Sequence, residues 1–99
     1  MSGQYVLDGH KPIEESDLLR WGQWFETADR AVAKDVVGNS RVSTVFLGLD
    51  HSFGSGPPMI FETMVFGGPM SDEIERYSTW EEAEKGHDEM VRRVRKAQP

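Results

Sequence analysis

Two apolar runs dominate the middle of the chain, at residues 42–49 and 59–66. Apolar residues occupy successive positions, so their side chains would point to both faces of each run. This is typical of strands that are central in a sheet or covered on both sides. The polar segment between the runs contains several glycines and prolines, which predict a loop. We therefore expect a β-hairpin with a polar tip.

The N-terminal third shows the spacing of an amphipathic helix. Ser16 or Asp17 is a suitable N-cap, and the pattern continues to about Lys34. Gly38–Asn39 is expected to end this element, because both residues tolerate positive φ. The apolar residues that recur every three or four positions and would form one stripe are Leu18, Trp21, Phe25, Ala28 and Val32.

The C-terminal segment gives the clearest helix. Two overlapping capping boxes, Ser78 with Glu81 and Thr79 with Glu82, mark its start. Glycine is unfavourable inside a helix, so Gly86 indicates close packing at that point. The residues expected on the buried stripe are Trp80, Ala83, His87, Met90, Val91 and Val94.

The remaining segments are short. Residues 4–7 favour a strand followed by a turn at Asp8–Gly9, and residues 72–77 fit either a third strand or an acidic loop. We predict an α+β fold, a small antiparallel β-meander or hairpin packed by two amphipathic helices. It would form a single domain over residues 1–99.

Composition narrows the class of protein. A chain of 99 residues buries roughly 60–68% of its unfolded surface, so it can fold without crosslinks. The absence of cysteine excludes a disulfide scaffold, a thiolate metal site and a cysteine nucleophile. No apolar run approaches the ~18 residues of a membrane span, and no secretion signal is visible. We expect a soluble, cytoplasmic protein without a cofactor.

The net charge of −6 argues against duplex nucleic acid as a partner, because phosphate binding needs a basic surface. Membrane binding is not expected either. The basic residues at positions 92–96 could grip an acidic partner, or they could simply complement the negative end of the last helix. The expected partner is a small molecule or a protein.

Asp50 and His51 follow the first apolar run directly. They could act as a general base with its carboxylate, or form one edge of a polar ligand site. Alternatively, Asp50 caps the loop in an Asx-type turn and His51 lies in solvent. Adjacent residues at a strand end point in opposite directions, so catalysis by this pair is disfavoured.

Glu62 interrupts the second apolar run. A buried carboxylate needs a partner, or its pKa rises. Glu62 could be a ligand anchor or general acid, or it could pair with Arg41 or Arg76 on a neighbouring strand. His87 would be a hydrogen-bonded core histidine, or it could meet Glu62 if it faces the sheet.

Trp24 lies at the edge of the first helical stripe, where it could stack a base-like ring or pack in the core. Phe53 belongs to the glycine-containing loop at residues 51–56, whose backbone N–H groups could approach a phosphate. This loop lacks the P-loop lysine and precedes no helix. No histidine spacing of a known metal motif occurs, so no metal site is expected.

Four phrases of the sequence are distinctive: LLRWGQWFETADR (residues 18–30), VSTVFLGLDHSFG (42–54), PPMIFETMVFGG (57–68) and RYSTWEEAEKGH (76–87). They resemble small proteins encoded in tailed-phage and prophage genomes, and the resemblance covers most of the chain. It implies a phage-encoded protein in a bacterial cytoplasm, often an accessory factor such as an inhibitor of host defence. It brings no catalytic assignment.

These observations favour a non-enzymatic binding protein, a counter-defence factor that sequesters a nucleotide-like signal or blocks a host protein. Its site would include Trp24, Asp50, His51, Phe53 and Glu62, in a pocket shared between subunits of a homo-oligomer. One alternative is a small hydrolase or phosphodiesterase using His51, Glu62 and His87. Another is a structural or virion-associated protein whose function is self-assembly.

Overall fold

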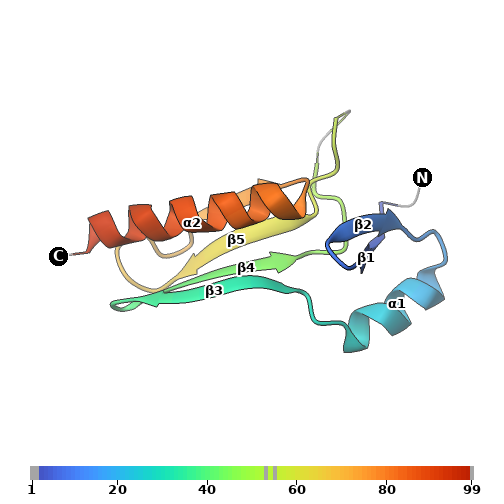
Figure 1. Cartoon of the computed structure of the whole chain (residues 1–99), viewed down its shortest axis with the longest axis horizontal. Coiled ribbons are helices and arrows are strands. Elements are labelled where there is room, and N and C mark those ends of the chain that lie inside the picture. The colour runs from blue at the N-terminus through green and yellow to red at the C-terminus, as the bar shows by residue number, and fades with distance from the viewer. Residues whose placement is uncertain (1–2, 53, 55, 99) are drawn as a thin grey trace.

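A four-stranded antiparallel sheet with one long helix across it forms the main body of the molecule (Figure 1). The computed structural model describes residues 3–52, 54 and 56–98. The strands lie in sequence order, and α2 packs on the sheet, which confirms the predicted α+β fold. The elements are β3 (Ala31–Val37), β4 (Ser40–Phe46), β5 (Phe61–Phe66), β6 (Ile74–Tyr77) and α2 (Trp80–Ala97).

A smaller N-terminal unit lies at one end of this body (Figure 1). It consists of the hairpin β1 (Tyr5–Asp8) and β2 (Lys11–Glu14), followed by α1 (Leu18–Thr27). The Trp21 indole N–H connects α1 to β1 and to the segment after β4. It donates to the carbonyls of Tyr5 at 3.0 Å and Gly48 at 3.2 Å. The predicted turn after β1 and the predicted cap at Asp17 are both confirmed.

The first helix is shorter than its sequence pattern predicts. It ends at Thr27, and residues 31–37 form β3 instead of continuing to Lys34. This segment is rich in valine, which favours strands, and it pairs with β4 from Ala31 to Val37, with a register shift between Ala31 and Ala33. Pairing with a neighbouring strand thus overrides the helical spacing. Gly38–Asn39 is the turn between β3 and β4, and Gly38 has a φ of 58°.

The two faces of the sheet differ, which corrects the expectation that the central strands are covered on both sides. In β4, buried residues alternate with partly or fully exposed ones. Directly paired residues share a face, so Thr44 lies beside Thr63 and Val42 beside Val65, under α2. The opposite face carries Arg41, Phe66 and Met64. Only one face of the sheet therefore contributes to the core.

The last helix follows its prediction closely. Thr79 and Glu82 form the capping box, with each side chain accepting from the other's backbone N–H at 3.1 Å. Gly86 allows the close packing that the sequence predicted, because a Cβ at that position would overlap the ring of Tyr77. The buried residues are the predicted Ala83, His87, Met90, Val91 and Val94, while Trp80 is half-buried.

Neither helix among the described residues has the length and apolar character that crossing a membrane requires.

Candidate functional site

Asp50 closes its own loop. Its Oδ1 accepts from the backbone N–H groups of Ser52 at 2.8 Å and Met59 at 2.9 Å. The bonds from Ser52 are the main reason that the pKa of Asp50 is lowered, because they stabilise the carboxylate. This is the Asx-type arrangement anticipated as the alternative to a ligand site. His51 is exposed, and Phe53 lies outside the described residues.

Glu62 and Trp24 also have local partners. Arg76 donates through Nε to Glu62 Oε2 at 3.0 Å, as one prediction from the sequence expected. Trp24 is half-buried and packs edge to face on Phe46, with ring centroids 5.8 Å apart. In the part of the chain that the structure describes, no hydrogen bond, ion pair or ring contact links Trp24, Asp50 and Glu62 to one another.

A buried polar cluster is centred on His87, which is 1% exposed. Its Nε2 lies 2.7 Å from Asp35 Oδ2, and its Nδ1 lies 2.6 Å from Thr44 Oγ1. Thr44 in turn shares a hydrogen bond with Thr63 across the β4–β5 pair. The cluster connects α2 with three neighbouring strands. His87 faces the sheet, but it meets Asp35 and Thr44 and does not meet Glu62, which points to the other face.

The hydrogen-bond order in this cluster follows from the carboxylate. Asp35 can only accept when ionised, so His87 Nε2–H donates to it. In the tautomer that carries its proton on Nε2, Nδ1 accepts from the Thr44 hydroxyl. An Asp–His–Thr series has the order of a base-activated nucleophile. However, both threonines are 0% exposed, so a substrate cannot reach them, and the cluster is structural.

Sequence reasoning singled out His87 but missed its partners. Asp35 belongs to a segment whose spacing resembled a helix, so its position on a strand was hidden. Thr44 and Thr63 occupy polar positions within the two apolar runs, and this was the available signal. Their pairing depends on the strand register, which the sequence does not specify.

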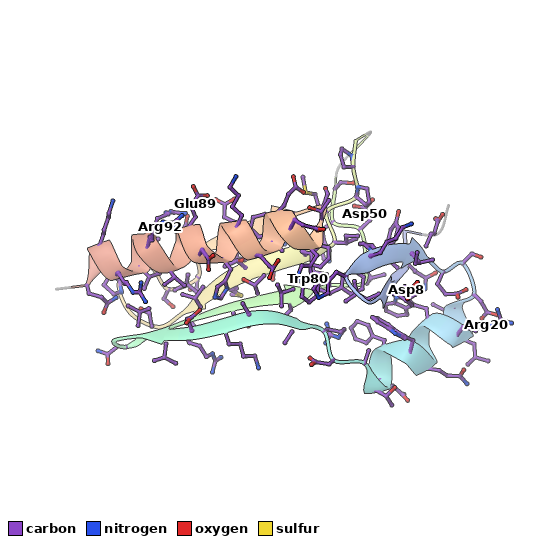
Figure 2. The ribbon with its side chains drawn as sticks, in the orientation of Figure 1. Asp8, Arg20, Asp50, Trp80, Glu89 and Arg92 are labelled. Carbon is purple, nitrogen blue, oxygen red and sulfur yellow. The ribbon has the colours of Figure 1, made fainter. Side chains whose placement is uncertain are left out.

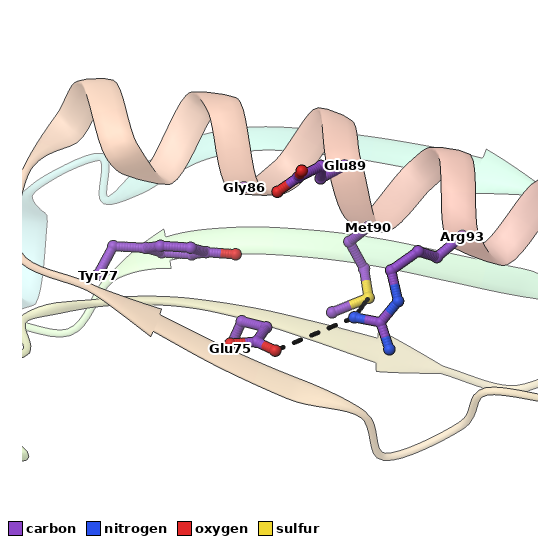
Figure 3. Close-up of a pocket in the computed structure, with 6 residues that line it drawn as sticks. All are labelled: Glu75, Tyr77, Gly86, Glu89, Met90 and Arg93. Carbon is purple, nitrogen blue, oxygen red and sulfur yellow. Dashed lines mark hydrogen bonds and ion pairs between the residues drawn. The ribbon is translucent and has the colours of Figure 1, made fainter.

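A small cavity lies between β6 and α2 (Figure 3). Its volume is about 170 Å³, below the range of roughly 300–1,000 Å³ typical of ligand pockets. Arg93 contacts Glu75 at 4.0 Å across it. The buried Tyr77 hydroxyl forms no hydrogen bond of ordinary geometry among the described residues; burial raises its pKa, and the nearby Thr63 side chain offsets part of that rise. The lining residues are Glu75, Tyr77, Gly86, Glu89, Met90 and Arg93.

A stacked ring pair joins the N-terminal hairpin to the main body. His10 lies on Trp80 with ring centroids 3.8 Å apart and the planes 6° from parallel. Figure 2 shows Trp80 at the end of α2 that faces the hairpin. This contact was not predicted, because Trp80 was assigned only to the helix stripe. It positions the hairpin and carries no evident chemistry.

The sheet surface that points away from α2 exposes apolar side chains, and we call it the open face. Val36 is 76% exposed, Ile74 41% and Phe66 38%. The Arg41 guanidinium lies over the Phe66 ring, 4.7 Å from its centroid. By cross-strand register, the open face comprises Lys34, Val36, Arg41, Ser43, Val45, Glu62, Met64, Phe66, Ile74 and Arg76.

Neither a metal centre nor a known relative assigns a function. Among the described residues, no group of three or more His, Asp or Glu side chains could hold a metal ion. Comparisons with protein-family models, with curated proteins and with solved structures find no match to this chain.

Proposed function

We propose that this chain is a small non-enzymatic binding protein that blocks a partner protein, in the phage setting and counter-defence role that its sequence resemblance implies. The open face is its binding surface. One observation carries the proposal: α2 covers one face of the sheet, whereas the other face exposes apolar side chains on three of its four strands. Exposed apolar groups surrounded by polar residues are characteristic of interaction surfaces.

The charge of the open face indicates the chemistry of the partner. Three cations lie on it, Lys34, Arg41 and Arg76, and Glu62 is its acid. Glu62 and Arg76 form an ion pair, so their charges cancel. The net positive charge of the open face therefore comes from Lys34 and Arg41. The chain as a whole carries a net charge of −6, so the charge of the open face is opposite in sign to the net charge of the molecule. The complementary partner surface combines apolar and acidic residues.

A protein partner is better supported than a nucleotide-like signal. The carboxylate of Asp50 is engaged by its own loop, and Trp24 packs against Phe46, so neither is free to line a deep pocket. Phe66 is the aromatic residue on the open face, and Arg41 already covers it. A platform for stacking several bases is therefore missing.

The test is affinity capture from lysate of a phage-susceptible bacterium, with quantitative mass spectrometry of the retained proteins. The variant Val36→Glu places an acid on the open face at a side chain that is 76% exposed. Leu19→Glu is the matched control, because Leu19 is 71% exposed and lies on α1. We expect a specific partner to be retained by wild type and Leu19→Glu, and reduced at least tenfold by Val36→Glu.

Two results would count against this function. Equal retention of the same partner by Val36→Glu would show that the open face is not the surface used. A change in mass of a nucleotide during incubation with the pure protein would indicate an enzyme instead. Raised salt should weaken the complex, because contacts between charged groups at an exposed interface are screened.

A further inference from the structure

The two edges of the four-stranded sheet differ in length. Strand β6, at one edge, has four residues, whereas β3, at the other, has seven. Strand β3 pairs with β4 on one side, and no strand among the described residues pairs with it on the other. It lies at the margin of the main body (Figure 1). An unpaired edge presents backbone N–H and C=O groups that can pair with another chain, and β3 is long enough for such pairing.

The hydrogen bonds of the sheet determine which residues of β3 point their backbone groups outward. In β5, the Val65 N–H donates to the Glu73 carbonyl at 3.0 Å, and the Val65 carbonyl accepts from the Asp72 N–H at 2.8 Å. Val65 therefore turns its backbone groups away from Val42, which lies opposite it in β4. Val42 instead exchanges its hydrogen bonds with Asp35, its partner in β3.

Lys34 and Val36 flank Asp35, so their backbone groups point the opposite way. Each of the two thus presents an N–H and a C=O along the free edge. Their side chains lie on the open face, and both residues are exposed. The register shift between Ala31 and Ala33 affects only the start of the strand. The regular part of the edge and the open face therefore meet at Lys34 and Val36.

Edge strands are commonly protected against pairing by proline, by bulges or by charged side chains. Strand β3 contains no proline, and its irregularity lies before the two residues that point outward. Val36, which is 76% exposed, is a β-branched apolar residue of the kind that pairs well across strands. Lys34 is the charged residue on the same side. The edge is therefore open to an added strand, and its lysine favours an acidic one.

We propose that the partner protein binds by adding an extended segment to β3, as a further antiparallel strand of the sheet. The inference rests on the function proposed for the open face, and it names the form in which the partner is held. Main-chain hydrogen bonds hold such a strand, and its alternate side chains give specificity. The side chain opposite Val36 is apolar and the one opposite Lys34 is acidic, because directly paired residues share a face.

A synthetic peptide of about seven residues is the probe. It carries a valine and a glutamate separated by one threonine, placed to oppose Val36 and Lys34, with threonines around them. In nuclear magnetic resonance titrations of the isotope-labelled full chain, the amides of Lys34 and Val36 should show the largest shifts. The peptide should also slow the exchange of these amides with solvent, because they become hydrogen-bonded.

Two N-methylated peptides separate backbone pairing from contact between side chains. N-methylation at the valine removes an N–H that faces β3, and we expect it to raise the dissociation constant at least tenfold. N-methylation at the threonine between the valine and the glutamate is the matched control. That N–H faces away from β3, so the dissociation constant should change less than twofold. Replacing the glutamate with lysine should weaken binding several-fold, because like charges directly opposite repel.

Val36→Pro tests the same edge from the protein side. Proline removes the outward N–H, keeps an apolar side chain and leaves the pairing with β4 intact, and edge strands accept proline at such positions. It should weaken peptide binding at least tenfold, whereas Val36→Ala, which keeps the N–H, should weaken it less than threefold. Circular dichroism checks that both variants fold. If Val36→Pro does not fold, the pair of N-methylated peptides on wild type decides the test.

Equal affinity of the two N-methylated peptides would overturn the inference, and so would the absence of saturable shifts at Lys34 and Val36. Shifts of these amides with protein concentration alone would also overturn it, because the edge would then bind a second copy. The function proposed for the open face fails separately, through the capture experiment with Val36→Glu. A partner that is lost in Val36→Glu but retained in Val36→Pro would leave that function standing and refute the added strand.

Discussion

Both helices of this protein have an amphipathic sequence pattern, but they bury their apolar residues to different extents. Along α2, which has 18 residues, each apolar stripe position faces the sheet, and the polar positions face solvent. Helix α1, with ten residues, buries none of its residues fully and turns Leu18 and Leu19 outward. Amphipathic spacing therefore indicates that a helix will pack, but it does not tell which apolar side the chain itself will cover.

The buried polar cluster connects α2 to the sheet, whereas α1 is held by the Trp21 indole N–H, which donates to two backbone carbonyls. We expect His87→Ala to lower the free energy of unfolding by about 3–5 kcal/mol. The reason is that it leaves a cavity and removes the hydrogen bond of Asp35 and one of the two hydrogen bonds of Thr44. Urea denaturation measures the change.

Leu19→Ala is the control for that experiment, and it should cost less than about 0.5 kcal/mol because Leu19 is an exposed surface position. A loss of under about 1 kcal/mol in His87→Ala would mean that the hydrogen bond between Thr44 and Thr63 is sufficient for the buried hydroxyl. In that case the contrast between the two helices would have to rest on apolar packing alone.

The two helical glycines give the most direct contrast, because the same substitution should have opposite signs. Gly86→Ala should destabilise the protein by about 1–3 kcal/mol through overlap with Tyr77. Gly22→Ala should stabilise it by up to about 1 kcal/mol. Chemical denaturation of both variants under one condition gives the comparison.

A double variant tests the cause of the Gly86 effect. If overlap with the ring is responsible, Gly86→Ala should be nearly neutral when Tyr77 is also replaced by alanine. Additive losses in the double variant would contradict this account. A loss of stability in Gly22→Ala would show that Gly22 does have a role within the chain.

The sequence predicted α2 in detail because several independent signals coincide there, including the capping box and the stripe around His87. It failed at β3 because Ala28 and Val32 continue a helical spacing into a segment that pairs with β4 instead. That error hid Asp35, and with it the partner of His87. The open face could not be predicted either, since it depends on which side of the sheet α2 covers.

Removing the N-cap of each helix should show which helix contributes to global unfolding and which one opens locally. Thr79→Ala removes one half of the capping box and should cost about 1 kcal/mol, seen in global unfolding because α2 holds the core. Asp17→Ala removes the acceptor for Leu19 and Arg20 N–H. It should mainly increase hydrogen exchange at those amides, because α1 contributes less to the core. Equal effects on global unfolding would mean that α1 folds as one unit with the sheet.

The smallest effect concerns the hydroxyl of Tyr77, which packs against α2 at Gly86. Tyr77→Phe removes a buried hydroxyl that forms no hydrogen bond of ordinary geometry among the described residues, although the Thr63 side chain lies near it. The variant should therefore be neutral or more stable by up to about 1 kcal/mol at neutral pH. Burial raises the folded-state pKa of Tyr77 above its ordinary 10.0. The contribution of this group to the free energy of unfolding is therefore fully present below the ordinary pKa. It is lost as the pH rises through the pKa of the folded state.

Urea denaturation at about pH 9 and about pH 11 should show a smaller loss for Tyr77→Phe than for wild type. Tyr5→Phe is the matched control, because the pKa of Tyr5 is also raised, but this residue lies in β1, on the hairpin beside α1. If the alkaline loss disappears only in Tyr5→Phe, the titration that limits stability belongs to the N-terminal unit. The packing of α2 on the sheet would then not control the titration of the Tyr77 hydroxyl.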